Sequence, residues 1–142
     1  NHESEFRDKS YLTQKIINTA YDISLKKASE LKIGSLEYTR DWSFAGDIVN
    51  AMFTLLKNDA KGAYVIGSGV KHSIKNMVEI VFNEFGITLD NNLKIDSGLL
   101  RNSDPVVRVS NPEKIYKDYG WKYDMQFDDL LIRCVDHKKK FT

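Results

Sequence analysis

The clearest structural pattern in the chain is the stretch Ser73-Ile74-Lys75-Asn76-Met77-Val78-Glu79-Ile80-Val81-Phe82-Asn83-Glu84-Phe85-Gly86. Its apolar residues recur every three or four positions, which places on one face of a helix Ile74, Met77, Val78, Val81, Phe82 and Phe85. Ser73 can cap the first turn of that helix, and Gly86 can end it as a C-cap. The stretch predicts an amphipathic helix packed inward on a core.

Similar spacing predicts helices on both sides of this stretch: residues 11–28, residues 43–56 with a face of Phe44, Ile48, Ala51, Met52 and Leu55, a short helix from Asn111-Pro112 through Tyr116, and a last helix with a core face of Phe127, Leu130, Leu131, Cys134 and Val135. Residues 31–33 read as a short strand and residues 63–66 as a short buried strand, while residues 93–100 read as extended or loop. The fold class we expect is therefore α/β, a helix-rich mixed lobe with a few short strands.

Length and composition fit a single soluble globular domain, with 142 residues, 42% hydrophobic and 29% charged. The net charge of +1 gives no argument for a nucleic-acid partner or a membrane surface. No apolar run approaches the roughly 20 residues of a membrane span. Cys134 is the single cysteine, so no intrachain disulfide can form, which suits a reducing compartment.

Two short motifs resemble parts of dinucleotide-dependent oxidoreductases. Gly67-Ser68-Gly69 sits between a predicted strand and helix, but His72 stands where a third glycine would be, so a tight structural turn is the better interpretation. Tyr11 and Lys15 are four residues apart, as in the Tyr-x-x-x-Lys pair of short-chain dehydrogenases. Any such pair one helical turn apart gives this match, so we predict that it is not catalytic.

The remaining candidates for chemistry are two arginines, since the three histidines are scattered and predict no metal site. Arg40 lies between a predicted strand and helix, and Arg101 follows Leu99-Leu100 in a loop-like stretch. A guanidinium matches phosphate oxygens through paired donors. The alternative for Arg40 is a surface ion pair with Asp41 or Asp47.

The order of short motifs along the whole chain resembles the GDP-mannose 4,6-dehydratases, which are extended short-chain dehydrogenase/reductases. The motifs that carry the resemblance are Asn1-His2-Glu3-Ser4, Arg7, Tyr11-Leu12-Thr13-Gln14-Lys15-Ile16, Ile33-Gly34-Ser35-Leu36, Arg40-Asp41-Trp42 with Asp47-Ile48-Val49, Tyr64-Val65-Ile66-Gly67-Ser68-Gly69, Leu100-Arg101, Asn111-Pro112-Glu113-Lys114 and Gly120-Trp121. The Asn-His-Glu-Ser box is the most specific of them. The chain departs from the family pattern at Glu5-Phe6, Ser43 and Asn102.

The resemblance implies that residues 1–142 are the C-terminal sugar-nucleotide-binding domain of a larger enzyme, with residues 1–10 as a loop on the cofactor side. That enzyme would use NADP, bound mainly by an N-terminal Rossmann domain, to oxidise a GDP-sugar at C4, eliminate water across C5 and C6, and return the hydride to C6. The nucleotide-binding glycines, the catalytic Tyr and Lys and the elimination acid would all precede Asn1. We therefore predict no catalytic residue and no turnover for this chain alone.

Carried over position by position, the resemblance assigns His2 and Arg7 to the NADP. It assigns Asn1, Lys15, Arg40 and Arg101 to the nucleotide diphosphate and its surroundings, and Asp104 to ribose hydroxyls. It also implies a cytoplasmic enzyme that forms a homo-oligomer. The alternatives are a nucleotide-sugar epimerase or reductase of the same family and a standalone, non-catalytic binding module; the start at Asn1 instead of Met favours an enzyme fragment.

Overall fold

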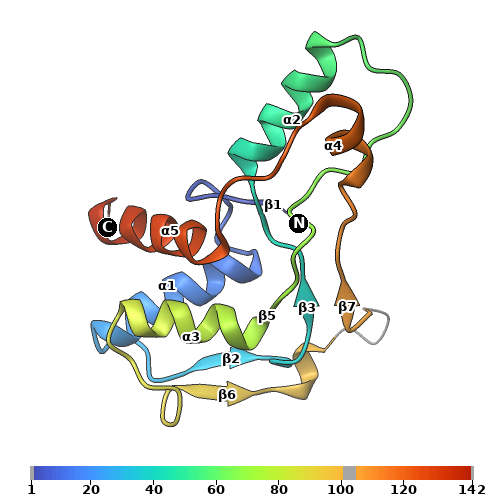
Figure 1. Ribbon diagram of the computed structural model, residues 1–142. Helices are drawn as coiled ribbons and strands as arrows, with labels where there is room; N and C mark the ends of the chain where they lie inside the picture. The colour runs from blue at the N-terminus through green and yellow to red at the C-terminus, as the bar shows by residue number, and fades with distance from the viewer. Residues whose placement is uncertain (1, 101–104, 142) are drawn as a thin grey trace.

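The structure of the protein is a computed structural model that describes residues 2–100 and 105–141 (Figure 1). Five helices and a set of very short strands follow one another in this order: β1 His2–Glu3, α1 Leu12–Ser24, β2 Leu31–Ile33, β3 Thr39–Arg40, β4 Ser43–Phe44, α2 Ala45–Lys57, β5 His72–Ser73, α3 Ile74–Glu84, β6 Leu93–Ile95, a 3-10 turn Ser97–Leu99, β7 Val107–Arg108, α4 Glu113–Tyr119 and α5 Phe127–Phe141. The helix-rich mixed α/β lobe predicted from the sequence is confirmed.

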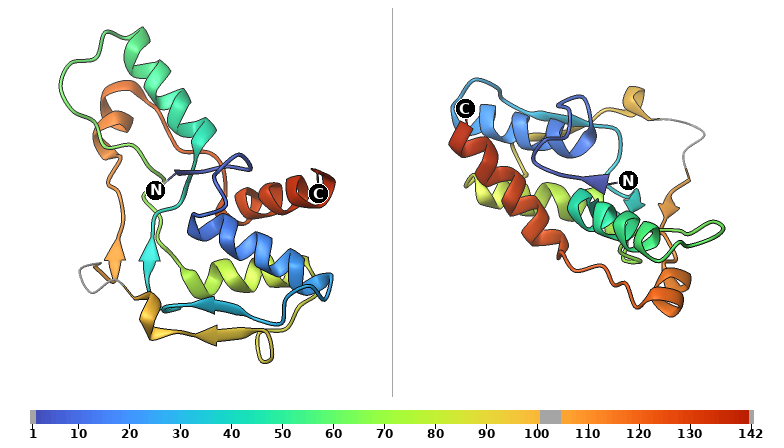
Figure 2. Two further views of the ribbon diagram at one scale, coloured as in Figure 1. Left: turned by 180° about the vertical axis from the view of Figure 1, so that it is seen from behind. Right: turned by 90° about the horizontal axis from the view of Figure 1, so that it is seen from above.

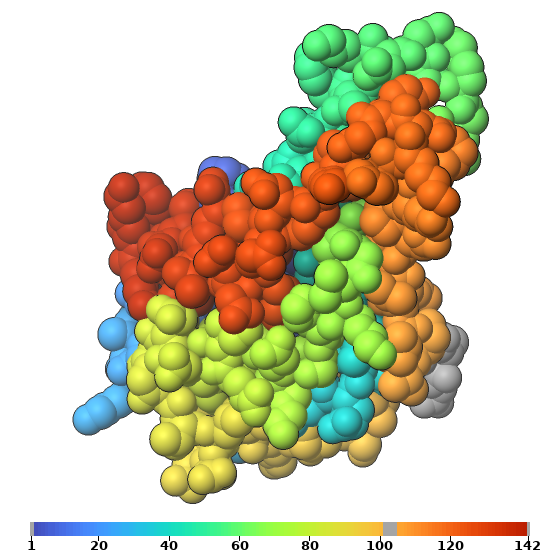
Figure 3. All heavy atoms as spheres, in the orientation of Figure 1, coloured from blue at the N-terminus to red at the C-terminus, as the bar shows by residue number. Residues whose placement is uncertain are grey.

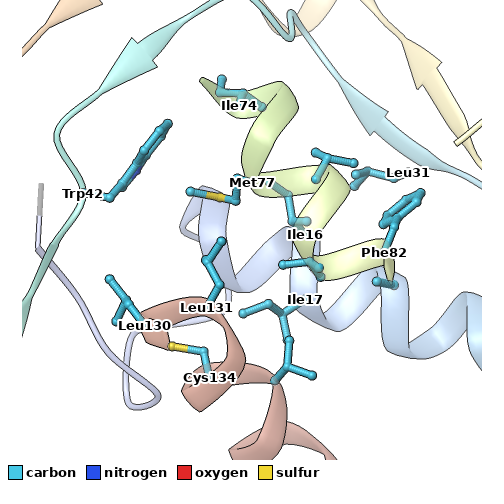
Figure 4. Packing of buried hydrophobic residues seen from close by; sticks show 14 of the residues in the cluster. Ile16, Ile17, Leu31, Trp42, Ile74, Met77, Phe82, Leu130, Leu131 and Cys134 are labelled. Carbon is cyan, nitrogen blue, oxygen red and sulfur yellow. The ribbon is translucent and has the colours of Figure 1, made fainter. Parts of the chain in front are cut away.

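The main core lies where α1, α3 and α5 pack against one another beside β2 (Figures 1 and 4). Ile16 and Ile17 of α1 meet Met77 and Phe82 of α3, and Leu131 of α5 closes the space between them. The predicted inward face of α3 is confirmed, since these residues are all buried: Ile74, Met77, Val78, Val81 and Phe82. Ser73 caps the helix through its Oγ, which accepts the Asn76 N–H at 3.0 Å, and Gly86 follows it at φ +66°.

Each strand has only two or three residues and pairs with a segment that lies far away in the sequence. β1 pairs in parallel with β4, with His2 opposite Ser43 and Glu3 opposite Phe44. β2 pairs in parallel with β6 over residues 31–33 and 93–95. β3 lies between β5, which is antiparallel to it, and β7, which is parallel. These pairings bring the N-terminal loop, the β3–β4 corner and the segment after residue 105 together (Figure 2).

Several helix boundaries differ from the prediction; α4, for example, spans Glu113–Tyr119 and ends at Tyr119, not at Tyr116. The first helix ends at Ser24, not at Ala28, because the chain turns sharply at Lys26, whose φ is +58°. The second helix begins at Ala45, because Ser43 and Phe44 pair with β1 as a strand. The sequence places Met52 on one face with Ile48 and Ala51, but those two residues are buried, whereas Met52 is 52% exposed.

The buried strand predicted for residues 63–66 is also wrong. The segment is not paired in a strand, and Val65 is 56% exposed. Tyr64 and Ile66 instead point into a small second cluster, where they pack beside Ala51, Ile115 and Trp121. None of the described helices is long and apolar enough to cross a membrane.

Val81→Ala should lower the free energy of unfolding by about 1–3 kcal/mol, because Val81 is fully buried and its truncation leaves space among α1, α3 and α5. Val49→Ala on α2 is the matched control, since Val49 is 62% exposed, and it should change stability by less than about 0.5 kcal/mol. Denaturant unfolding of both variants measures the difference. Equal stabilities would contradict the burial of Val81.

Candidate functional site

A cavity of about 470 Å³ lies where the N-terminal loop and the start of α1 face the ends of β2 and β3. Three of the cations assigned from the sequence line it together: Arg7, Lys15 and Arg40. They come from a loop, a helix and a strand that are far apart in the chain. Gly34 contributes to the wall because a Cβ there would lie 3.1 Å from the backbone of Leu99. The absence of a side chain at Gly34 thus lets the 3-10 turn close one side of the cavity.

Lys15 is fixed at the cavity wall by a backbone contact. It lies on α1, one turn from the N-terminal end, and its Nζ donates to the carbonyl oxygen of Lys32 at 2.9 Å. Tyr11, the other member of the Tyr-x-x-x-Lys pair, is covered by the guanidinium of Arg7, whose Cζ lies 3.6 Å from the ring centroid. The pair therefore serves to join α1 to β2 and to support Arg7.

Arg7 lies beside a buried acid. Its Nε is 3.9 Å from Oε2 of Glu3, and both atoms are buried without a hydrogen-bond partner within the described residues. Burial raises the pKa of Glu3 despite the opposing attraction of Arg7. Arg7 thus carries its charge at the cavity wall next to a carboxylate that neutralises it at long range and makes no direct hydrogen bond to it.

Arg40 is oriented by a backbone carbonyl of its own strand and by the carbonyl of the residue that precedes β7. Its Nη1 donates to the Thr39 oxygen at 2.8 Å and to the Val106 oxygen at 3.2 Å. Its Cζ lies 5.4 Å from the ring centroid of Tyr38, which also lines the cavity. Of the two acids considered as partners for Arg40, Asp47 accepts the backbone N–H groups of residues 124 and 125.

The other acid, Asp41, is buried at the β3–β4 corner and collects hydrogen bonds from three segments. Its carboxylate accepts Ser43 Oγ at 2.9 Å, Ser68 Oγ at 2.5 Å and Gly69 N–H at 3.0 Å, and also accepts the Ser110 hydroxyl. Burial on its own would raise the pKa of Asp41, but these hydrogen bonds outweigh it and hold the pKa below the usual value. No local sequence pattern predicts this set of hydrogen bonds around Asp41, which we call the Asp41 cage.

The glycine motif forms one wall of the cage, so its interpretation as a tight structural turn is confirmed. A side chain at Gly67 would collide with Ser110 and Asp41, and Gly69 adopts φ +74°, in the left-handed region that favours glycine. The turn wraps around a carboxylate of its own chain. This geometry explains two glycines in the motif without a bound dinucleotide.

His2 lines a different cavity from Arg7, although the sequence assigned both residues to one cofactor. This second cavity has a volume of about 230 Å³, and its polar lining includes Asp41, Arg108 and Ser110. Burial is the main cause that lowers the pKa of His2. Arg108, on β7, was not anticipated, because its place beside His2 depends on the long-range pairing of β3 with β7.

Glu5 and Phe6 attach the N-terminal loop to α5. The Glu5 carboxylate accepts a bidentate set of hydrogen bonds from Arg133, including Nε at 3.0 Å, and these bonds lower the pKa of Glu5. The Phe6 ring packs edge-on against His137, with centroids 5.4 Å apart. The loop that carries Arg7 is therefore held from the C-terminal helix.

Three of the predicted substrate-binding positions, Asn1, Arg101 and Asp104, lie outside the described residues. Cys134 is buried in the main core, as predicted, and burial raises the pKa of its thiol to about 12. Within residues 2–100 and 105–141, no three His, Cys, Asp or Glu side chains cluster so that they could hold a metal ion.

The sequence and the fold both match known proteins. The model of the GDP-mannose 4,6 dehydratase family matches residues 1–134. The chain belongs to this family. It is 39% identical over 152 residues to GDP-mannose 4,6-dehydratase of Sinorhizobium fredii, covering 95% of this chain and 43% of that protein, and 32% identical over 144 residues to the human GDP-mannose 4,6 dehydratase, covering 100% and 37%. The chain thus spans less than half the length of these relatives.

Solved structures show the same fold at low sequence identity. The structure of RMD from Pseudomonas aeruginosa, complexed with NADPH, superimposes with a TM-score of 0.86 at 17% identity, covering 100% of this chain and 46% of that one. dTDP-glucose 4,6-dehydratase from Bacillus anthracis, in complex with NAD, gives a TM-score of 0.86 at 18% identity and covers 99% and 43%. The lobe therefore has the same fold as a part, less than half, of each of these two chains.

Asp41→Asn should destabilise this dehydratase-family lobe by about 3 kcal/mol, because the amide turns an NH₂ toward buried donors that need an acceptor. Because the folded pKa of Asp41 is depressed, its stabilisation is fully present above about pH 4. It is lost as the pH falls through the lower, folded value.

Thermal unfolding of the parent and of Asp41→Asn between pH 3 and 7 checks both parts of this expectation. The stability gap between the two proteins should be constant at neutral pH and narrow in acid. Asp136→Asn, an exposed position on α5, is the control and should leave the curve unchanged. A difference in stability between the two proteins that does not depend on pH would contradict an ionised Asp41 carboxylate.

Proposed function

We propose that the chain is the sugar-nucleotide-binding part of an NADP-dependent GDP-mannose 4,6-dehydratase. Membership of the family supports the reaction class, and the shorter length of the chain relative to the family's curated members supports its place as one part of the enzyme. The full enzyme would oxidise the sugar at C4, eliminate water across C5 and C6, and return the hydride to C6. We further propose that it works in the cytoplasm as a homo-oligomer.

The observation that carries this proposal is the meeting of Arg7, Lys15 and Arg40 at one cavity. A nucleotide sugar carries two phosphates in series, and its recognition requires several cations that approach from different directions. Tyr38 and Trp42 add aromatic surface to the same cavity, where the base or the ribose can pack. Lys15 and Arg40 would bind the diphosphate together with Arg101 and Asn1, and Asp104 would accept from the ribose.

The cofactor assignment rests on Arg7 and His2. Arg7 fits an anionic cofactor because its guanidinium is stacked on Tyr11 and the residue lines the cavity. His2 fits less directly, since it lines the neighbouring cavity with Arg108. NADP would supply the hydride acceptor, and the residues of this chain would hold its charged groups at the boundary between the two cavities.

Arg40→Lys and Arg101→Lys, made in the full enzyme, should each weaken GDP-mannose binding by roughly tenfold or more, because a lysine keeps the charge but loses the paired donors. One charge-assisted contact corresponds to about 1.5–3 kcal/mol. NADP affinity should stay nearly constant. Titration calorimetry with each ligand measures both values, and Lys27→Ala, an exposed lysine beyond α1, is the control. Unchanged GDP-mannose affinity in both arginine variants would contradict the diphosphate site.

The 142-residue chain on its own should form no 4-keto sugar from GDP-mannose and NADP. The resemblance places the cofactor glycines and the catalytic Tyr and Lys before Asn1, and the one Tyr-x-x-x-Lys pair considered in this chain supports the fold. A coupled assay or mass spectrometry of the reaction mixture detects the product. Its formation by the isolated chain would overturn the assignment of the lobe as the binding part.

A further inference from the structure

The loop of residues 4–11, which connects β1 to α1, carries Arg7 to the cavity of about 470 Å³ and is held internally by short-range hydrogen bonds. The Arg7 N–H donates to the Ser4 carbonyl oxygen at 3.1 Å, and the Phe6 N–H donates to Ser4 Oγ at 3.2 Å. A surface turn of this kind opens easily, because water replaces the bonds that are lost. The place of Arg7 at the cavity therefore depends on what attaches this loop to the rest of the lobe.

Arg133 of α5 attaches the loop through the side chain of Glu5. Figure 3 shows α5, in red, in front of the N-terminal segment, of which a small blue part is visible at the upper edge of the helix. The Nε atom of Arg133 lies 3.0 Å from both carboxylate oxygens of Glu5, and Nη2 donates to the same carboxylate. The Glu5 side chain is only 7% exposed. A bidentate pair with a covered carboxylate fixes the direction of both side chains, which an ordinary surface ion pair does not.

The guanidinium of Arg133 also contacts the strand beside β1. Its Cζ lies 5.2 Å from the ring centroid of Phe44, which is opposite Glu3 in the ladder of β1 and β4. β4 follows β3, the strand of Arg40, after a corner of two residues. Arg133 is absent from the described residues that line the cavity. Its influence on a ligand there must therefore pass through the segments that it contacts.

The other contacts of the loop are weaker or lie elsewhere. Phe6 is edge-on to His137, one turn further along α5, but it remains 79% exposed, so this contact removes little apolar surface from water. The start of the loop is held by α1, since Gln14 Nε2 donates to the Ser4 carbonyl oxygen at 3.1 Å. The ion pair is therefore the main attachment of residues 5–7 to α5.

We propose that Glu5 and Arg133 are positioning residues, whose ion pair holds Arg7 at the wall of the cavity and so sets the affinity of the lobe for a phosphate group there. Arg7 follows Glu5 by two residues in the same turn, and its Nε is buried. A guanidinium that is already in place binds a phosphate without first losing its freedom of movement. The inference rests on the proposed function in one respect, that the ligand of Arg7 is a phosphate-bearing cofactor.

The first test follows Arg7 without any ligand, through the exchange of its Nε–H proton with water in the 142-residue chain, measured by NMR on the arginine side-chain signals. This proton exchanges slowly while the loop is closed, because Nε is buried. Glu5→Gln should speed the exchange by roughly tenfold or more, since exchange follows the population of the open loop. Arg133→Gln, at a side chain that is 50% exposed, should give the same result.

The reversed pair, Glu5→Arg combined with Arg133→Glu, should restore slow exchange, because it rebuilds the ion pair with its charges exchanged. Glu113→Gln is the matched control. Glu113 forms an ion pair with Lys117 on α4, 2.6 Å apart and away from the loop, so its loss should leave the exchange of Arg7 unchanged (Figure 1). Circular dichroism of each variant shows that the fold is kept.

The second test measures the affinity of the chain for inorganic pyrophosphate, the phosphate probe, by titration calorimetry. Glu5→Gln should weaken binding by roughly threefold or more, because Arg7 must then be ordered when the anion binds. In the Arg7→Met background the same substitution should have no further effect, since the ion pair acts through Arg7.

Equal exchange of the Arg7 proton in the parent and in both single variants would overturn the inference. So would an equal loss of pyrophosphate affinity with and without Arg7, because the ion pair would then stabilise the lobe as a whole. Fast exchange in the single variants and slow exchange in the reversed pair, with an affinity that does not depend on Arg7, would support the attachment of Arg7 and contradict the phosphate ligand of the proposed function.

Discussion

The carboxylate of Asp41 is the constraint on which the arrangement of the site depends. It sits at the corner between β3 and β4 and accepts hydrogen bonds from Ser68 and Ser110, which are 27 and 69 residues away in the sequence. A buried carboxylate without donors would be strongly destabilising, so the chain must bring both segments to it. In doing so it fixes β3, the strand of Arg40, next to β7 and next to both cavities.

The parts of the fold that could be predicted are those encoded locally. The period of α3 specified its buried face because neighbouring positions on a helix surface share one environment. The strands β3, β5 and β7 could not be predicted, since two-residue strands have no period and exist only through partners elsewhere in the chain. Residues 63–66 form no strand, and Val65 and Met52 are exposed, because an apolar side chain does not by itself tell whether its position is covered in the folded chain.

The residues of the candidate site also fall into those that could be predicted from the sequence and those that could not. Nothing in the local sequence around Arg7, Lys15 or Arg40 separates a phosphate ligand from a surface cation, and it was the family resemblance that selected them; the structure then brought them to one cavity. Residues that orient others were missed. Glu5 and Arg133 are 128 residues apart, and their ion pair, which anchors the loop of Arg7, follows only from the packing of that loop on α5.

These features together suggest a division of stability within the lobe. The helices α1, α3 and α5 share a large core, and α1 carries Lys15, so we expect this half of the lobe to be the more stable one. The half built from α2, α4 and residues 63–66 has a small cluster and an exposed apolar face, so we expect it to be the less stable of the two. Asp41 joins the two halves through Ser68 and Ser110. The hydrogen bonds of Asp41 therefore hold the β3–β4 corner, which follows Arg40, against the two segments that carry Ser68 and Ser110.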